Sequence, residues 1–252
     1  MDQLLSVLPT ILACSAAFLV AGTVKGVIAL GLPLAGLPLL MLAVDVQTAI
    51  TLLMVPLVLS NLLQALQGSG TAALLRRFWP VLVALGIGTF VGLALFSVLD
   101  RHVLLLTIGA LAIFFSTLSM LQPNLAVPPQ AELWLGPPIG FLAGILGGMS
   151  TLFGPPLAIY VVGLRLPRDT FVKVISIMYL AASSFLLLGG AGAGTAAPRD
   201  LFLSLLAMIP VYIGMLIGQC IRRYVDPERF RLLVLAVVWL TGANLIRMGS
   251  GF

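Results

Sequence analysis

Long apolar stretches, separated by short polar or proline-containing stretches, run through the whole chain. Stretches long enough to cross a bilayer as helices lie at 4–30, 46–66, 77–99, 103–121, 133–152, 171–188, 200–221 and 230–248. Two shorter apolar pieces, 34–43 and 156–164, would each reach about 15 Å as helices, which is about half of the hydrocarbon core. The pattern predicts an all-α polytopic membrane protein in which each short piece is a half-helix.

The composition agrees with this class and excludes an ordinary soluble domain. Of 252 residues, 61% are hydrophobic and 8% are charged, whereas soluble domains carry about 25% charged residues. The formal net charge of +5 comes from basic residues scattered over short loops, so we expect the lipid bilayer and not a nucleic acid as partner. Cys14 and Cys220 both lie within apolar stretches, and no disulfide is expected between them.

Two sets of glycine motifs occur twice in the same order. Gly22-x-x-x-Gly26-x6-Pro33 recurs as Gly144-x-x-x-Gly148-x6-Pro155, and Gly88-x-x-x-Gly92 recurs as Gly214-x-x-x-Gly218, at offsets of 122 and 126 residues. The chain is therefore interpreted as two membrane repeats, 1–121 and 132–252, joined by a cytoplasmic linker at 122–131. For the second motif pair we expect close helix packing and no chemistry.

Basic residues fall in alternating loops, and the alternation is opposite in the two repeats. Cytoplasmic loops carry the excess of Lys and Arg, and the best assignment places loops 67–77, 122–132, 165–173 and 222–231 in the cytoplasm. Nine basic residues then lie inside (Arg76, Arg77, Arg165, Arg168, Lys173, Arg222, Arg223, Arg229, Arg231) and three outside (Arg101, Arg199, Arg247). Both termini are predicted outside. The pattern predicts two inverted repeats, each a broken helical hairpin plus three transmembrane helices.

The turn before each half-helix is the first candidate site. It contains Gly31, Leu32 and Pro33 in the first repeat, and Gly154 and Pro155 in the second. Proline is favoured at a helix start, and a helix start carries free N–H groups and partial positive charge that bind anions. Since helix breaks at matching positions of two repeats mark transporter sites, we expect an anion site here. The alternative is a pair of proline kinks with glycine packing.

Lys25 lies inside the first apolar stretch, where the second repeat has Gly147. Charged residues inside a membrane are functional candidates, and an anionic substrate would balance Lys25 because no acidic residue adjoins it in sequence. Alternatively, its side chain reaches out to the cytoplasmic interface.

Further candidate binding residues surround the two turns. They are Gly26, Asn61, Gly148, Ser150 and Thr151. The two hydroxyls could donate to an anion or bond back to their own helix. The Asn61 amide could contact the substrate or form a hydrogen bond between helices, and the second role is favoured.

The sequence indicates no catalytic chemistry. Every Asp, Glu and His falls in or beside a predicted loop, no Cys/His spacing suits a metal ion, and no Walker-type phosphate loop occurs. We therefore expect neither an enzyme nor a cofactor.

The ordered set of motifs resembles the TauE/SafE family of sulfite and organosulfonate exporters, also called the four-toluene-sulfonate uptake permease family. The resemblance covers almost the full chain and rests on Gly22-x-x-x-Gly26-x6-Pro33, Gly68-x-Gly70 ahead of Arg76-Arg77-Phe78-Trp79-Pro80, Gly88-x-x-x-Gly92, and the run Phe141 to Gly148 leading to Gly154-Pro155-Pro156. It implies a carrier for small sulfur-containing anions in the bacterial inner membrane. Lys25 departs from the family, because it interrupts a glycine-rich string that is typical at this point.

The leading hypothesis is a secondary transporter that exports sulfite or an organosulfonate such as sulfoacetate by alternating access, through rocking of the repeats. Moving one negative charge out of a negative cell interior releases about 2.3 kcal/mol per 100 mV, so export needs no coupling ion on that account. The alternatives are an uptake permease for another small anion and a non-transporting membrane scaffold. The sequence leaves the coupling ion and formation of a homo-oligomer open.

Overall fold

The computed structural model of the chain is a bundle of helices. It describes residues 2–28, 31–66, 70–121, 128–192, 198–221, 224 and 227–250. The elements are α1 (Asp2–Ile28), α2 (Leu32–Leu40), α3 (Val46–Ala65), α4 (Thr71–Val98), α5 (Arg101–Leu121), η1 (Pro129–Ala131), α6 (Glu132–Ser150), α7 (Gly154–Gly163), α8 (Arg168–Gly192), α9 (Pro198–Ile221) and α10 (Pro227–Gly249). The described residues contain no strand, and the helix bounds differ from the sequence-based ranges by six residues or fewer.

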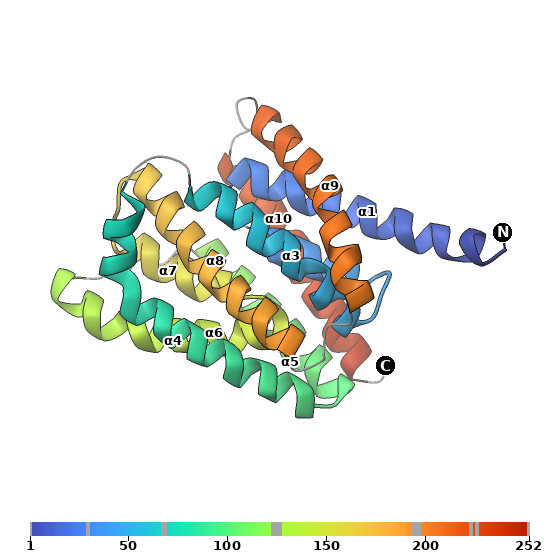
Figure 1. Cartoon of the computed structure of the whole chain (residues 1–252), viewed down its shortest axis with the longest axis horizontal. Helices are drawn as coiled ribbons and strands as arrows, with labels where there is room; N and C mark the ends of the chain where they lie inside the picture. The colour runs from blue at the N-terminus through green and yellow to red at the C-terminus, as the bar shows by residue number, and fades with distance from the viewer. Residues whose placement is uncertain are drawn as a thin grey trace.

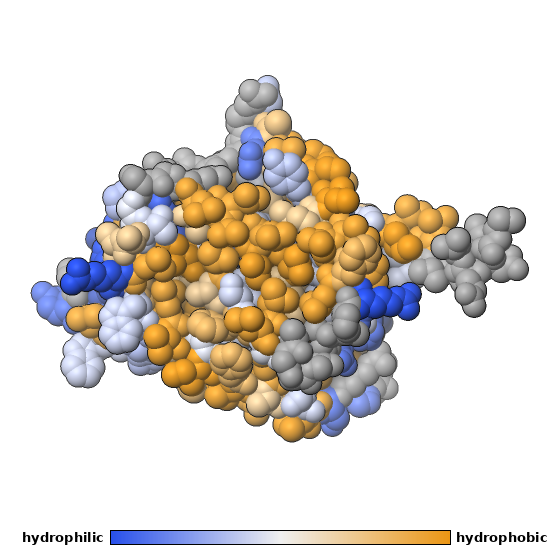
Figure 2. All heavy atoms as spheres, in the orientation of Figure 1, coloured by the Kyte–Doolittle hydropathy of each residue, from blue (hydrophilic) through white to orange (hydrophobic). Residues whose placement is uncertain are grey.

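The described helices confirm the polytopic membrane class. Six of them, α1, α3, α4, α6, α8 and α9, contain segments long and apolar enough to cross a bilayer, and α5 contributes a shorter apolar segment, His102–Leu118. Figure 2 shows apolar residues over most of the face in view, with hydrophilic residues gathered toward its left and right edges. The short helices α2 and α7 have 9 and 10 residues, as expected for half-helices.

Helices of the two halves pack against each other in a reciprocal pattern (Figure 1). The first helix of each half packs on the fourth helix of the other, α1 on α9 and α6 on α4. Helices at equivalent places also pair, α3 with α8 and α5 with α10. Gly109 faces Gly242 while Gly249 faces His102, so α5 and α10 run antiparallel. An inverted repeat requires such a reversal, and the orientation of each half in a bilayer stays a prediction.

The duplicated glycines provide the two closest of these interfaces. A Cβ on Gly26 of α1 would lie 2.9 Å from the Cα of Gly218 on α9, and one on Gly92 of α4 would lie 2.9 Å from the Cα of Gly148 on α6. Real Cβ atoms do not approach other backbones so closely, so each glycine is required by its partner helix. The packing role expected for Gly88, Gly92, Gly214 and Gly218 is confirmed, and each of these glycines packs on the first motif of the other half.

A proline in α3 explains how α9 is attached to it. Pro56 has no N–H, so the carbonyl oxygen of Leu52 loses its usual donor within the helix. The Ser204 hydroxyl of α9 donates to this oxygen at 2.8 Å and accepts the N–H of Val55 at 3.1 Å. Since an unsatisfied backbone group in a bilayer costs several kcal/mol, this contact stabilises both the helix at Pro56 and the α3–α9 pairing.

The structure corrects the placement of three basic residues that the charge pattern assigned to cytoplasmic loops. Arg76 and Arg77 belong to the second turn of α4, because this helix begins at Thr71. Lys173 lies in α8 and is 7% exposed, so it is a second buried lysine. The predicted ranges began at residues 77 and 171, whereas α4 begins at Thr71 and α8 at Arg168. Cys14 and Cys220 are free, as expected. Residues 122–127 of the predicted linker and Arg222 and Arg223 lie outside the described residues.

We predict that Gly92→Leu disrupts the α4–α6 interface. A leucine side chain would collide with the backbone of Ile145 and Gly148, and overpacking of this kind costs about 1–3 kcal/mol. Thermal unfolding of the purified protein in detergent should show a lower midpoint. Ala94→Leu on the exposed face of the same helix is the matched control, and an equal effect of both variants would contradict close packing at Gly92.

Candidate functional site

The two helix breaks lie at equivalent places in the two halves. Helix α1 ends at Ile28 and α2 begins at Leu32, while α6 ends at Ser150 and α7 begins at Gly154. Both half-helix starts are inside the protein, since Leu32, Phe153 and Thr151 have no appreciable exposure. Gly31 caps α2 with a φ of 102°, a left-handed conformation that glycine adopts without strain. Irregular backbone at such depth is tolerated only where it is buried or lines a cavity.

Lys25 is buried in the last turn of α1 and bonds across to α3. Its side chain is 2% exposed, and its Nζ donates to Oδ1 of Asn61 at 2.6 Å. The side chain therefore does not reach out to an interface, as the alternative interpretation required. No carboxylate that the structure describes lies within ion-pairing distance of it. A buried ammonium that has an amide oxygen as its partner keeps its positive charge unbalanced.

Asn61 is held in the orientation that serves Lys25. Its amide nitrogen donates to the carbonyl oxygen of Leu57 at 2.7 Å, one turn back on α3. This bond identifies the nitrogen end of the amide from its partner, so the oxygen end is the one that faces Lys25. Asn61 thus forms the hydrogen bond between helices that the sequence favoured, and it positions the charged group at the first break.

The second break carries hydroxyl groups in place of the lysine. Ser150 Oγ donates to the carbonyl oxygen of Leu146 at 2.7 Å and accepts the N–H of Leu152 at 3.3 Å, so it bonds back to its own turn. Thr151 is fully buried, has a φ of 62°, and its Oγ1 is the one buried side-chain polar atom in the described residues that lacks a hydrogen-bond partner. Of the two hydroxyls, Thr151 is the one free to bind a ligand.

Contacts on α8 bring the second break toward the first. Gly154 at the start of α7 has no room for a Cβ, because the Tyr179 hydroxyl of α8 lies against it, and the Tyr179 and Phe153 rings pack edge to face at 6.2 Å. Ser176 Oγ of α8 donates to Gln64 Oε1 of α3 at 3.3 Å. Helices α3 and α8 run antiparallel (Figure 1). Asn61 lies one turn before Gln64 on α3, and Tyr179 lies one turn after Ser176 on α8. Because the helices are antiparallel, these two residues lie at the same height along the crossing, one turn from the Gln64–Ser176 contact.

The two half-helix starts differ in the donors they offer an anion. The first N–H groups of a helix have no partner inside it, but proline has none to offer. Helix α2 keeps the N–H groups of Leu32 and Leu34 on either side of Pro33. In α7 the two residues after Gly154 are Pro155 and Pro156, and neither has an N–H group. The start of α2 therefore offers more free backbone N–H groups than the start of α7.

The remaining predicted residues have structural roles in their surroundings. Gly26 and Gly148 face the partner helices α9 and α4, where they permit backbone contact. Leu32 and Pro33 are buried in the first turn of α2, and Pro155 is the second residue of α7. These residues shape the two breaks, while Lys25, Asn61 and Thr151 supply the polar side chains.

Sequence reasoning missed one ion pair near the beginning of α6. Arg77 of α4 pairs with Glu132, the first residue of α6, through contacts of 2.7 Å (Nε to Oε1) and 2.6 Å (Nη2 to Oε2). Tyr160 of α7 donates to the carbonyl oxygen of Glu132 at 3.2 Å. Both charged residues were expected on the cytoplasmic side. Their pairing was not predicted, because the two residues are 55 positions apart and the periodicity of the sequence does not indicate contacts over such a distance. This cluster ties α4, α6 and α7 together.

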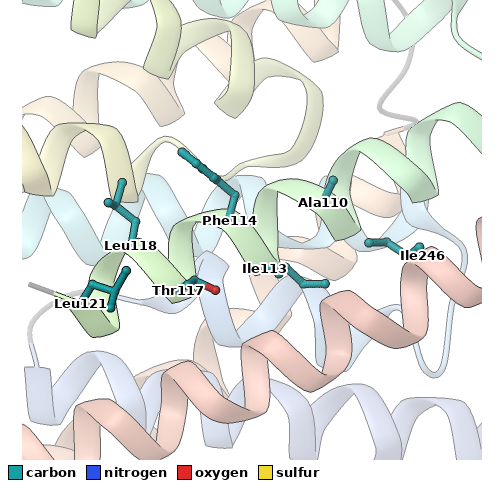
Figure 3. Close-up of a pocket in the computed structure, with 7 residues that line it drawn as sticks. All are labelled: Ala110, Ile113, Phe114, Thr117, Leu118, Leu121 and Ile246. Atoms are coloured by element: carbon teal, nitrogen blue, oxygen red, sulfur yellow. The ribbon is translucent and has the colours of Figure 1, made fainter.

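A surface groove on α5 lies apart from the two breaks. It is lined by Ala110, Ile113, Phe114, Thr117, Leu118, Leu121 and Ile246 (Figure 3). Thr117 is the one polar side chain of this lining, so the groove suits apolar surroundings and offers an anion no charge.

We predict that Lys25 and Asn61 are energetically coupled. Asn61→Leu leaves a buried ammonium without its partner, which costs about 3–5 kcal/mol, whereas Lys25→Met leaves an unpaired amide oxygen at about 1–3 kcal/mol. The double variant removes both polar groups and should unfold at a higher temperature than Asn61→Leu alone. Additive effects of the two substitutions on the unfolding midpoint would contradict the coupling.

The comparisons with known proteins agree with this architecture. A family model described as sulfite exporter TauE/SafE matches residues 14–245. Comparison with curated proteins and with solved structures gave no significant match. The match includes both helix breaks and both pairs of glycine interfaces, and a transporter family accords with a multi-pass bundle that carries a charged residue at a helix break. The chain belongs to the TauE/SafE sulfite exporter family of membrane transporters.

Proposed function

We propose that the protein exports a small sulfur-containing anion, sulfite or an organosulfonate such as sulfoacetate, across the bacterial inner membrane by alternating access. The observation that carries this proposal is Lys25, a buried lysine whose Nζ has an amide oxygen 2.6 Å away as its partner. A transported anion would balance the charge during part of the cycle. The family membership supports the sulfur-containing class of substrate.

The first break offers such an anion several donors. An ammonium has three N–H groups, and the bond to Asn61 uses one of them. The N–H groups of Leu32 and Leu34 at the start of α2 add uncharged donors together with the positive end of the helix dipole. Charge-assisted hydrogen bonds are about twice as strong as neutral ones, so Lys25 would dominate the affinity. The oxygens of a sulfite or sulfonate group match this set of donors.

The energetics favour export through such a site. With the cell interior negative, the outward movement of one negative charge releases about 2.3 kcal/mol for each 100 mV. The placing of both termini outside the cell follows from the distribution of basic residues and belongs to this proposal.

The glycine interfaces bear on which parts would move. Close backbone contacts join α1 to α9 and α4 to α6, and each contact links the two halves. Rocking one repeat against the other would separate both interfaces. We therefore favour movement between two mixed units, one built around α1 and α9 and the other around α4 and α6, with the α3–α8 crossing between them.

The test is flux of sulfite and of sulfoacetate from proteoliposomes under an imposed membrane potential. Wild-type protein should show saturable, charge-moving flux. Lys25→Met removes a charge-assisted bond worth about 1.5–3 kcal/mol and should reduce flux at low substrate concentration by at least about tenfold. Asn61→Asp gives Lys25 an internal counter-ion and should also reduce it. Arg76→Gln, at an exposed position on α4, is the control that keeps flux.

Other results would redirect the proposal. Flux unaffected by Lys25→Met would leave a transporter whose site is elsewhere. Uptake of another anion in place of export would identify a permease, and the absence of flux for a wide panel of anions would favour a membrane scaffold.

A further inference from the structure

The two helix breaks differ in where they carry positive charge. The last turn of α1 contains Lys25, whereas the last turn of α6 contains no basic residue and has Gly147 at the equivalent position. The Phe153 ring packs against Gly147 and leaves no room for a side chain there. The partial negative charge at the end of a helix is therefore accompanied by a full positive charge in the last turn of α1 and by none in the last turn of α6.

Oxygen atoms take the place of the lysine at the second break. The second and third residues after the last glycine are Ile28 and Ala29 in the first repeat and Ser150 and Thr151 in the second. The hydroxyls therefore occur in the copy that lacks the lysine. Ser150 is engaged within its turn, which leaves Thr151 Oγ1, a fully buried atom without a hydrogen-bond partner.

The backbone of the same turn adds further acceptors. Helix α6 ends at Ser150, so the carbonyl groups of Gly148, Met149 and Ser150 have no partner within the helix. Thr151 donates its N–H to the Gly147 oxygen at 2.7 Å, and Leu152 donates to Ser150 Oγ. Pro155 and Pro156 have no N–H. The break thus gathers acceptor oxygens in a region poor in donors.

We propose that the α6–α7 break binds a sodium ion through Thr151 Oγ1 and the carbonyl oxygens at the end of α6. Carbonyl oxygens of unwound segments and of helix C-terminal ends coordinate Na⁺ in membrane transporters with broken helices. The bound ion supplies at the second break the charge that Lys25 supplies at the first. The bound ion also gives the buried Thr151 hydroxyl a partner. The backbone of Thr151 is left-handed, which is a rare conformation for a β-branched residue, and this conformation places the residue in the turn.

The chemistry of the turn favours a monovalent cation such as Na⁺ over a proton or a divalent ion. A proton would need a titratable base, and residues 147–156 contain no Asp, Glu or His. Divalent ions are bound mainly through carboxylates, and the described residues contain no group of three or more His, Cys, Asp or Glu that could hold a metal. Neutral oxygens on a helix C-terminal end suit a monovalent ion.

Cation binding and anion transport are linked but separable. If Na⁺ at the second break raises the affinity of the anion at the first, the anion raises the affinity of Na⁺ by the same factor. This linkage rests on the proposed function, whereas binding of Na⁺ itself does not. An ion that stays at the break throughout the cycle adds no moved charge, so electrogenic anion export is retained.

The experiment measures thermal unfolding of the full-length protein in detergent without any transported anion. NaCl is replaced stepwise by KCl or choline chloride at constant total salt. Because a ligand that binds the folded state raises its stability, the wild-type midpoint should rise with Na⁺ and not with the other two cations. Thr151→Val removes the hydroxyl at nearly constant shape and should abolish this rise, while Thr151→Ser should retain it.

Thr51→Val is the matched control, since Thr51 is a buried threonine of α3 whose hydroxyl bonds to the Gln47 oxygen of its own helix at 3.0 Å. It should keep the Na⁺ response. A wild-type midpoint that is the same in the three salts, or a Na⁺ response that survives in Thr151→Val, overturns the proposal. If anion flux is observed but Na⁺ does not raise the unfolding midpoint, the exporter proposal holds and the cation site is contradicted. If Na⁺ raises the midpoint but no anion flux is observed, the cation site holds and the exporter proposal is contradicted.

Discussion

Polar groups inside this bundle must find partners within the protein, because a bilayer core offers them none. The carbonyl oxygen of Leu52, which Pro56 leaves without a donor, accepts a hydrogen bond from a hydroxyl of another helix. The Lys25 ammonium donates to an amide oxygen on α3. Each of these contacts joins helices that are distant in sequence, so satisfying a polar group also fixes a packing contact. The two helix breaks are the places where this constraint is met incompletely, by an unbalanced charge at one and an unpartnered hydroxyl at the other.

The two halves share the same packing and differ in their polar residues. The paired glycines of α1 with α9 and of α4 with α6 are duplicated, because the close approach of backbones permits no larger residue. The polar side chains are not duplicated, since Lys25 corresponds to Gly147 and Ala29 to Thr151. We assign an anion to the break that has the lysine and a cation to the break that has the unpartnered hydroxyl.

Hydropathy predicted the helices closely because each must present a long apolar surface, and the glycine motifs predicted close packing because glycines four apart share a helix face. The hydrogen-bond partner of Lys25 was not predictable from the sequence. Lys25 and Asn61 are 36 residues apart, and sequence spacing does not indicate which helices pack together. The burial of Lys173 was missed because the charge pattern assigned this basic residue to a loop. Thr151 was predicted as a substrate-binding residue, but its lack of a hydrogen-bond partner follows from the turn in the structure.

The arrangement of close and loose interfaces limits how the protein can move. Backbone contacts at the glycine pairs tolerate little sliding, because interiors packed to this density resist deformation. Helix α3 contains no glycine, so its crossing with α8 lacks such a glycine pair, and the crossing includes the Gln64–Ser176 side-chain hydrogen bond at 3.3 Å. Lys25 bonds to α3, and Gly154 packs on Tyr179 of α8, so both breaks are attached to this crossing. A shift of α3 against α8 would therefore change the separation of the two breaks while leaving the glycine interfaces intact.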